Sequence, residues 1–283
     1  MSYDLLSNKL GFDYQESSGD CGQRALIHAL LLLGIPINKY QAHKFTDVPR
    51  WLANVRGTDD KQLIRGIRKA GCQAVSLHIS GELKFRREVD KHLKKGIPLI
   101  VCAEEYQHWA VLAGKYDDEY YYWIDSSESE LYGVSKWKDV EYWLRNDVDG
   151  YREYYAIGLI PREQGELKKS IVPNFRAVYT MFGDDEFAEY WGYYLQDLLG
   201  IFDTPARKRK VITAEEFFER YGKTIYENVC YFASEADVLS LKWEIRNYER
   251  VATAHHLTLS EEFAPGAISS LSAALTVIAC NSM

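Results

Sequence analysis

The sequence predicts an α+β domain over residues 1–164, followed by a mostly helical domain over residues 165–283. Three observations support this prediction. Helical patterns dominate between residues 21 and 95. Three short apolar runs then follow one another closely between residues 98 and 125, which is typical of antiparallel strands. Beyond the polar stretch 162–169, the apolar residues recur mainly at helical spacing.

The first helix is expected over Cys21–Leu33, an apolar run that ends where Gly34 and Pro36 follow. Both residue types stop helices, glycine by adopting a left-handed conformation and proline by lacking a backbone N–H. A second helix is expected over Asp59–Ala70, which has acidic residues in its first turn, basic residues near its end and Gly71 directly after it. This order of charges complements the helix dipole, so both segments have defined ends.

The rest of the first domain alternates between strand and helix patterns. In chain order we expect a strand at Val75–Ile79, a basic helix at Lys84–Lys95, strands at Pro98–Cys102, His108–Lys115 and Tyr120–Asp125, a helix at Lys136–Arg145 and a strand at Tyr154–Ile160. The acidic run at residues 117–119 is a short polar connection between two of these strands. Such a connection is typical of an antiparallel hairpin, so these two strands are expected to pair.

Helical spacing dominates the second domain. We expect helices at Glu186–Leu199, Ala214–Ala233, Ala236–His256 and Ala267–Ala279. Thr213 and Glu216 match the capping box, in which two side chains bond each other's backbone N–H groups. The last helix is apolar but shorter than the roughly 20 residues that a bilayer span needs, so no membrane span is expected.

The composition limits the possible functions. Of the 283 residues, 47% are hydrophobic and 27% are charged, which is typical of an ordered globular protein. The net charge of −7 argues against nucleic-acid partners, because binding to phosphates needs a basic surface. The sequence contains no complete phosphate-binding loop and no metal-ligand spacing, so no cofactor and no metal are expected.

The cysteines and the N-terminus indicate the compartment. The five cysteines are odd in number and none belongs to a CxxC pair, as expected for reduced thiols. Residues 1–10 have neither the basic start nor the apolar stretch of a signal peptide. We therefore expect a cytoplasmic protein.

One cysteine has a sequence context unlike that of the others. Cys21 follows a polar stretch and begins an apolar helix, where the free N–H groups and the positive end of the helix dipole favour a thiolate. Asp20 and Ser18 are expected to cap this helix, and Gly19 and Gly22 to let a substrate approach the backbone closely. Free cysteines in apolar segments are usually inert core residues, and this is the expectation for Cys72, Cys102, Cys230 and Cys280.

Three further residues complete a candidate catalytic group with Cys21. His108 opens one strand of the expected hairpin and Asp125 ends the other, so both are expected at the same end of the sheet. A histidine there can act as general base for a cysteine, and the carboxylate orients the imidazole. Gln15 supplies an amide N–H donor that, with the Cys21 backbone N–H, forms an oxyanion hole. The order and spacing of these four residues predict nucleophilic catalysis.

The same residues resemble the papain-like cysteine peptidases, and most of all the C39 branch (bacteriocin-processing, double-glycine) and its stand-alone C39-like relatives. The resemblance covers about residues 10–160 and is carried by Gln15, the run Asp20-Cys21-Gly22, the run His108-Trp109-Ala110-Val111-Leu112, and Asp125. It implies a papain-like fold, in which an N-terminal helix bears the cysteine and an antiparallel sheet bears the histidine and the aspartate.

The resemblance also implies a role for each residue. Gln15 maps onto the oxyanion-hole donor, Cys21 onto the nucleophile, His108 onto the base and Asp125 onto the residue that orients the base. Two positions differ from the family, which often has proline after the Cys-Gly pair and after the aspartate. This chain has Gln23 and Ser126 there.

We therefore expect a cysteine peptidase that hydrolyses a peptide or isopeptide bond in a peptide or protein substrate through a Cys21–His108–Asp125 triad. Two alternatives remain open. An acyltransferase, of transpeptidase or transglutaminase type, would use the same triad with an amine in place of water. A catalytically silent papain-like module would use the cleft only to bind a partner. The helical domain, which carries no catalytic motif, is expected to contact a protein substrate or partner.

Overall fold

The computed structural model describes residues 10–17, 19–127, 131–148, 150–162, 185–202, 210–231 and 237–281. The expectations for Ser18, for residues 1–9 and for the boundary between residues 164 and 165 lie outside these described residues. The chain divides into two units, which are described separately below. The first comprises Met1–Gln164 and Phe175–Gly192, and the second comprises Gly165–Asn174 and Tyr193–Met283.

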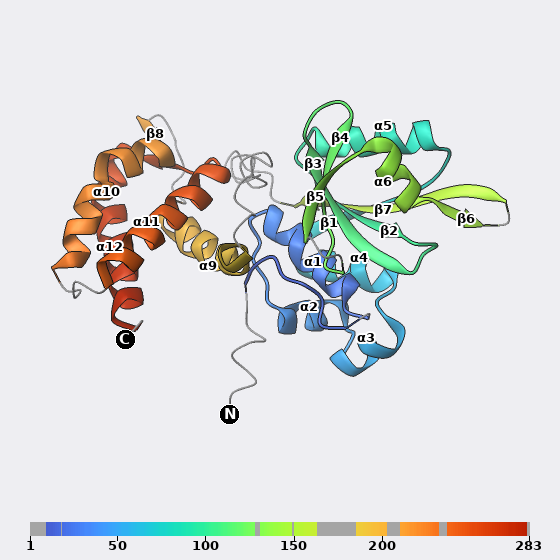
Figure 1. The fold of residues 1–283 in the computed structure, drawn as a ribbon, viewed down its shortest axis with the longest axis horizontal. Coiled ribbons are helices and arrows are strands. Elements are labelled where there is room, and N and C mark those ends of the chain that lie inside the picture. Colours follow the sequence, from blue (N-terminus) through green and yellow to red (C-terminus); the bar gives the residue numbers. More distant parts are fainter. Residues whose placement is uncertain are drawn as a thin grey trace. The chain divides into compact units, whose positions relative to one another are not determined.

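A seven-stranded sheet forms the centre of the first unit (Figure 1). Its strands are β1 (Cys72–Ser80), β2 (Leu99–Ala103), β3 (His108–Lys115), β4 (Tyr120–Ile124), β5 (Tyr132–Lys136), β6 (Asn146–Val148) and β7 (Tyr151–Pro161). They are ordered β1-β7-β2-β3-β4-β5, with β6 paired to β7, and every pair is antiparallel. β3 and β4 form the expected hairpin, with Leu112 opposite Trp123 and a bulge before Gly114. The α+β prediction is confirmed.

Two helices cover one face of this sheet and build its core. They are α5 (Glu82–Leu93) and α6 (Trp137–Leu144). Phe85 of α5 and Val140 of α6 belong to one buried cluster with Leu99 and Val101, which are alternate residues of β2. Alternate strand residues point to the same face, so this packing holds the central strands from one side.

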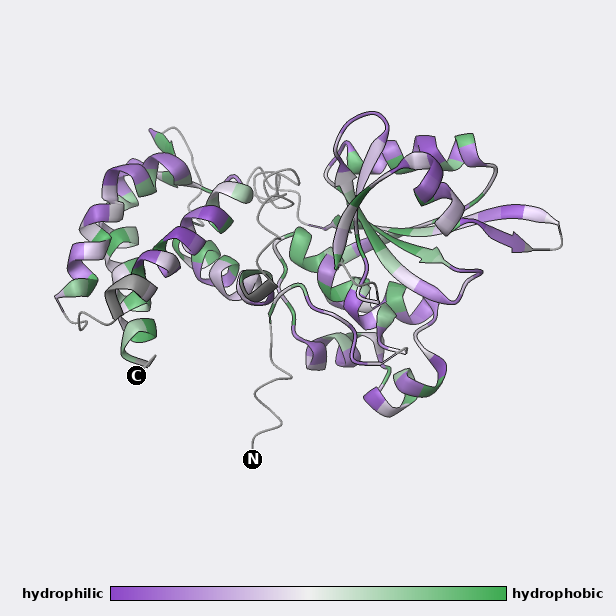
Figure 2. Ribbon diagram, viewed as in Figure 1, coloured by the Kyte–Doolittle hydropathy of each residue, from purple (hydrophilic) through white to green (hydrophobic). Residues whose placement is uncertain are grey.

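Helix α1 (Cys21–Leu32) contacts β2 and β3, and Figure 1 shows it on the side of the sheet away from α5 and α6. Every residue of α1 is buried. Figure 2 shows hydrophobic residues concentrated in α1 and in the central strands. Three further helices lie near it: α2 (Lys39–Thr46), α3 (Arg50–Arg56) and α4 (Asp60–Lys69). The sequence does not predict α2 and α3, because both are too short to show a clear helical period.

The segment before α1 runs along the first part of α9 (Asp185–Phe202). The backbone N–H of Phe12 donates to the carbonyl of Ala188 at 3.1 Å. A side chain at Gly11 would overlap the carbonyl of Glu189, so only glycine permits this close approach. The contact fixes the path of the chain that leads into the candidate site.

The second unit is mostly helical. In it α10 (Ala214–Cys230), α11 (Asp237–Ala254) and α12 (Ala264–Asn281) pack against one another. Thr213 and Glu216 form the expected capping box at the start of α10. The sequence does not predict three short elements here: β8 (Val211–Thr213), β9 (Thr258–Ser260), which pairs with β8, and the 3-10 helix η2 (Glu261–Phe263).

Helix α12 is longer than the sequence analysis predicts, spanning Ala264–Asn281 instead of Ala267–Ala279. Pro265 fits in its first turn, where a missing N–H costs no helical hydrogen bond. Within the described residues, Glu261–Cys280 is the one helical stretch long and apolar enough to cross a membrane by length and composition, a test that core helices of soluble proteins also pass. The expectation that the last helix is too short for a span is therefore wrong.

All five cysteines are free. Cys72 and Cys102 are buried in the first unit, as expected for core residues. In the second unit Cys230 is half-buried and Cys280 is exposed, so the expectation of a core residue is wrong for Cys280. Its neighbour Ala279 is buried. Adjacent residues of a helix point in different directions, and a buried position is therefore followed here by an exposed one.

Candidate active site

Cys21 is the first residue of α1 and is buried, with 3% of its surface exposed. The N–H groups of the first turn have no partner within the helix, and the positive end of the helix dipole lies there. The preceding Asp20 occupies the N-cap position, but its side chain accepts no capping hydrogen bond. Lys39 Nζ binds the Asp20 carboxylate at 2.6 Å instead. The expected capping role of Asp20 is therefore wrong, because the carboxylate takes the stronger, charged partner.

Gly19 and Gly22 serve packing within the protein. A side chain at Gly19 would overlap the carbonyl of Ala53 in α3, and a Cβ at Gly22 would lie 2.7 Å from the Cβ of Thr58. Both glycines let the start of α1 approach neighbouring parts of the same unit. This corrects the expectation that they open the backbone to a substrate.

The β3–β4 hairpin brings His108 and Asp125 together. Nε2 of His108, the first residue of β3, lies 2.7 Å from Oδ1 of Asp125, which directly follows β4. Both residues are buried, and Asp125 completely so. The same carboxylate oxygen accepts hydrogen bonds from the backbone N–H and the hydroxyl of Ser127, each at 2.9 Å. The carboxylate is thus held by Ser127 while it holds the imidazole.

Cys21 is a second partner of the His108 ring. The Cys21 side chain lies close enough to the imidazole to interact with it electrostatically, as Asp125 does. Because Nε2 faces Asp125, Nδ1 is the nitrogen left for the sulfur. Burial lowers the pKa of His108, but the interactions with Asp125 and Cys21 outweigh burial and raise the pKa to about 10. Burial alone would raise the pKa of Asp125, and the bond from His108 keeps that pKa below its usual value.

Gln15 lies beside Ser126, the residue that follows Asp125. Its backbone N–H donates to the Ser126 carbonyl at 2.9 Å, and the Ser126 hydroxyl donates to its Oε1 at 3.2 Å. With Oε1 engaged, the NH₂ end of the amide is left to donate to another group. Arg24 of α1 binds the neighbouring Glu16 at 3.4 Å, which ties this segment to the helix that begins with the candidate nucleophile.

A second buried thiol lies near the candidate nucleophile. Cys102 of β2 is 2% exposed. Burial is the main cause that raises the pKa of Cys102 to about 12, and the charge of Cys21 adds to it. Cys102 therefore stays a thiol at neutral pH. Burial does not distinguish the two cysteines, and the feature that sets Cys21 apart is its interaction with His108.

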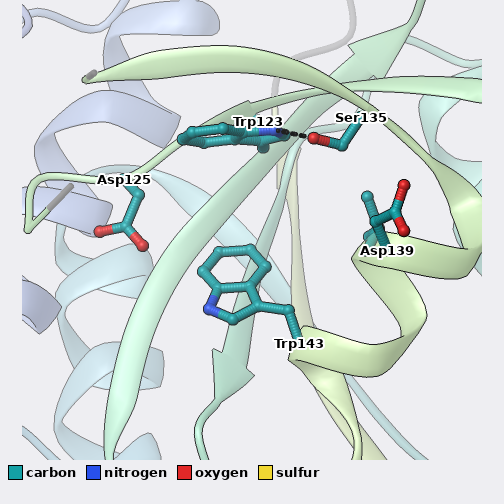
Figure 3. Close-up of a pocket in the computed structure, with 6 residues that line it drawn as sticks. Trp123, Asp125, Ser135, Asp139 and Trp143 are labelled. Carbon is teal, nitrogen blue, oxygen red and sulfur yellow. Dashed lines mark hydrogen bonds between the residues drawn. The ribbon is translucent and has the colours of Figure 1, made fainter. Parts of the chain in front are cut away.

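A pocket adjoins the His108–Asp125 pair. This tryptophan pocket has a volume of about 190 Å³ and is lined by Trp123, Asp125, Ser135, Asp139, Val140 and Trp143. Figure 3 shows the two indoles inclined to one another at its wall. The ring of Trp143 also lies 6.5 Å from the ring of His108, measured between centroids. Residues of β4, β5 and α6 therefore form a cavity next to the candidate triad.

Ser126, Ser127 and the tryptophan pocket are the parts of the site that the sequence analysis missed. A serine two residues after an aspartate often bonds back to it in a turn, and this spacing is the signal that points to Ser127. The pocket has no such local signal, because it depends on how α6 packs beside β4 and β5. Among the described residues, no group of three or more His, Cys, Asp or Glu side chains is arranged to hold a metal ion.

No protein-family model and no curated protein sequence matches the chain. Among solved structures, it is similar to a double-glycine-motif protease from an AMS/PCAT transporter in complex with the leader peptide, with 17% identity, a TM-score of 0.39, and coverage of 55% of this chain and 94% of that one. It is also similar to the peptidase domain of Streptococcus ComA, a bifunctional ABC transporter involved in quorum sensing, with 16% identity, a TM-score of 0.39, and coverage of 55% and 99%. The values for the peptidase domain of Streptococcus mutans ComA are 16% identity, a TM-score of 0.31, and coverage of 54% and 99%.

The first of these solved structures is a double-glycine-motif protease, the type that the sequence resembles. The arrangement implied by that resemblance is also present in the first unit. Its N-terminal helix bears Cys21, and its antiparallel sheet bears His108 at the start of one strand and Asp125 at the end of the next.

Proposed function

We propose that the protein is a cysteine peptidase that hydrolyses a peptide or isopeptide bond. Cys21 is the nucleophile, His108 the general acid and base, and Asp125 the residue that orients His108. Gln15 and the backbone N–H of Cys21 stabilise the oxyanion. One observation carries the proposal: the His108 ring binds the buried Asp125 carboxylate through one nitrogen and interacts with the thiol at the start of α1.

The reaction begins with His108 protonated and Cys21 as a thiolate. The sulfur attacks the carbonyl carbon, so that a C–S bond forms and negative charge moves to the carbonyl oxygen, where Gln15 donates a hydrogen bond. His108 gives its proton to the leaving nitrogen as the C–N bond breaks, and a thioester remains. Water then attacks the thioester and gives a proton to His108. The C–S bond breaks, the acid is released and the starting pair is restored.

Asp125 contributes through the orientation and charge of the imidazole. Its Oδ1 fixes Nε2, so that the ring presents its other nitrogen to the sulfur. The carboxylate also stabilises the imidazolium that exists before the attack, in agreement with the raised pKa of His108. No step of the proposed reaction requires a metal or an organic cofactor.

The first test is alkylation with iodoacetamide at pH 7, followed by mass mapping of each cysteine. We expect rapid labelling at Cys21 that is lost in Cys21→Ala and slowed at least about tenfold in His108→Ala, because the protonated imidazole no longer stabilises the thiolate. Cys280 is exposed and provides an internal reference for an ordinary thiol. Cys102→Ala is the matched control, which removes a neighbouring buried thiol and should label like the wild type.

Labelling of Cys21 no faster than that of Cys280 would contradict the proposal and favour a catalytically silent binding module. A peptide library, incubated with the wild type and with Cys21→Ala and read by mass spectrometry, then tests turnover. Hydrolysis and acyl transfer use the same residues and differ only in what attacks the thioester. Added glycinamide distinguishes them, because acyl transfer adds the mass of the amine to the product.

We also propose that the protein resides in a reducing compartment, as in the cytoplasm, and that its second unit contacts a protein. Five free cysteines support the first point. Exposed apolar residues in the second unit, Phe263 and Val277, support the other. Cell fractionation tests the location. A photo-crosslinking residue at position 277 tests the contact, and the absence of any protein adduct would contradict it.

A further inference from the structure

The tryptophan pocket has the size of a subsite for one side chain. Its volume is about 190 Å³. A cavity of roughly 150 Å³ holds one benzene ring, so this pocket accommodates a single large side chain. A whole peptide or a nucleotide would need a larger cavity.

The indoles of Trp123 and Trp143 form walls of the pocket that attract cations. The ring centroids of Trp123 and Trp143 lie 6.3 Å apart and their planes are inclined by 54°. The rings therefore form a corner, as Figure 3 shows, and a group seated in that corner meets both rings. The face of an aromatic ring carries negative partial charge, and tryptophan binds cations best. The N–H of Trp123 donates to Ser135 Oγ at 2.9 Å, which holds this wall in place.

Two carboxylates add negative charge to the pocket. Asp139 lines it from the first turn of α6 and is exposed. Asp125 lines it as well and is fully buried, and its Oδ2 has no hydrogen-bond partner among the described residues. None of the six lining residues is basic. A buried carboxylate oxygen without a partner is costly, and a cation brought near it lowers that cost.

The negative charge persists through the reaction proposed above. Before the attack, the charges of a Cys21 thiolate and a His108 imidazolium oppose each other and Asp125 stays ionised. In the thioester both Cys21 and His108 are neutral, and Asp125 is still negative. A cation in the pocket is therefore favoured at both stages by its attraction to Asp125 and Asp139.

We propose that the tryptophan pocket binds one positively charged side chain, an arginine or a lysine, of a substrate residue that follows the scissile bond. The position along the substrate rests on the proposed function: His108 protonates the leaving nitrogen, so the chain after the bond passes His108, and Trp143 lies against that ring. The binding of a cation rests only on the pocket itself. A guanidinium is the best fit, because its planar group stacks on indole.

The test is a titration of the full-length protein, labelled with ¹⁵N in its tryptophans, with Nα-acetyl-argininamide and Nα-acetyl-lysinamide. The two indole N–H signals are assigned with Trp123→Phe and Trp143→Phe. We expect both signals to shift with either amide. Nα-acetyl-citrullinamide, which has nearly the shape of the arginine compound but no charge, should bind at least about fivefold more weakly. Asp139→Asn should weaken arginine binding about threefold, whereas the control Asp147→Asn, at an exposed aspartate outside the pocket, should not.

Equal binding of the citrulline and arginine compounds would overturn the proposal and identify an apolar pocket. The absence of shifts at both tryptophans would also overturn it. The titration is independent of catalysis, because Cys21→Ala should bind the cations like the wild type. Slow labelling of Cys21 together with cation binding would therefore contradict the proposed peptidase activity and support the cation site. Rapid labelling of Cys21 without cation binding would support the proposed peptidase activity and contradict the cation site.

Discussion

The hydroxyl of Ser126 donates a hydrogen bond to Oε1 of Gln15 at 3.2 Å, and the backbone N–H of Gln15 donates to the Ser126 carbonyl at 2.9 Å. Ser126 is 4% exposed, so water competes little for these bonds. The peptidases that the sequence resembles often have proline at this position, and proline has no hydroxyl. In this structure the serine hydroxyl engages the oxygen of the Gln15 amide, which leaves its NH₂ group for the oxyanion proposed above.

Ser126→Ala should therefore lower kcat and leave KM nearly unchanged. Without the hydroxyl, the Gln15 amide can rotate and present its oxygen to the oxyanion. The loss of one neutral hydrogen bond of about 1 kcal/mol corresponds to about fivefold in kcat. Steady-state kinetics on a peptide found in the library screen measures this. Ser80→Ala, at an exposed position at the end of β1, is the matched control. A rise in KM at constant kcat would show that Ser126 binds substrate instead.

Gln15→Ala should separate two reactions of the same thiolate. Peptide hydrolysis passes through an oxyanion, and the removal of one oxyanion donor typically costs about 10²–10³ in kcat. Alkylation by iodoacetamide forms no oxyanion, so its rate at Cys21 should stay close to that of the wild type. The measurement compares both rates in the same protein sample. An equal loss of both rates would mean that Gln15 supports the structure around Cys21 and has no role in catalysis.

Cys21, His108 and Asp125 can be grouped from the sequence because each residue lies at the end of an element with a clear pattern. The acidic turn between β3 and β4 also predicts their register, and the bulge before Gly114 shifts it by only one residue. The partners of Ser126 lie more than a hundred positions away along the chain, and no local pattern indicates such a contact. The pocket was missed for the same reason, since Trp123 and Trp143 come from different elements that meet only by tertiary packing.

The glycines also show that the sequence does not indicate which groups meet by tertiary packing. The need for close approach at Gly19 and Gly22 was predicted from the sequence, but the approaching group was not. The structure identifies α3 and Thr58 as the neighbours, where the sequence analysis expected a substrate. A glycine shows that space is required and says nothing about what occupies it.

The contribution of His108 to the stability of the protein should fall as the pH rises from about 7 to 10. His108 has a pKa of about 10 in the folded protein, above its value of about 6.5 in an unfolded chain. The folded protein therefore keeps a proton that the unfolded chain releases. The stabilisation is fully present below about pH 6.5 and is lost as the pH rises through the folded pKa. Urea unfolding at several pH values should show a smaller loss in His108→Gln, and the exposed control His256→Gln should behave like the wild type.

His28 should make the protein sensitive to acid. It is fully buried within α1, and its Nε2 accepts the backbone N–H of Asp13 at 3.2 Å, which requires an unprotonated nitrogen. Burial is the main cause that lowers the pKa of His28 to about 3, and the charge of Arg24 adds to it. Unfolded chains bind a proton at this residue below about pH 6.5, so stability is lost as the pH falls from there towards 3.

The contribution of His28 should be a slope of about 1.4 kcal/mol per pH unit in the free energy of unfolding. His28→Gln keeps a hydrogen-bond acceptor and cannot titrate in this range. We expect urea unfolding between pH 7 and 4 to give a shallower slope for this variant than for the wild type, whatever its stability at pH 7. Identical slopes would show that His28 is protonated in the folded protein as readily as in the unfolded chain.

The turn before His108 stores backbone strain that should be measurable. Glu104, Glu105 and Tyr106 have φ values of 53°, 54° and 67°, in the left-handed region that costs a non-glycine residue about 1–2 kcal/mol. Asn146 is fully buried, and its side-chain oxygen accepts the Tyr106 N–H at 2.7 Å, which holds the turn in this conformation. Glu105→Gly should therefore raise the free energy of unfolding by up to about 1 kcal/mol, once the greater freedom of glycine in the unfolded chain is subtracted.

The matched control for this variant is Glu119→Gly, in an exposed turn whose φ values are ordinary, where glycine should lower stability slightly. Asn146→Ala should do more, because it releases the turn and removes the partner of the half-buried Tyr106 N–H, at a cost of about 1 kcal/mol or more. It should also slow alkylation of Cys21, since the turn that it releases positions His108. The contrary outcome is that the two glycine variants lower the free energy of unfolding by the same amount. In that case the turn is not strained in solution, and the rigid placement of His108 has another cause.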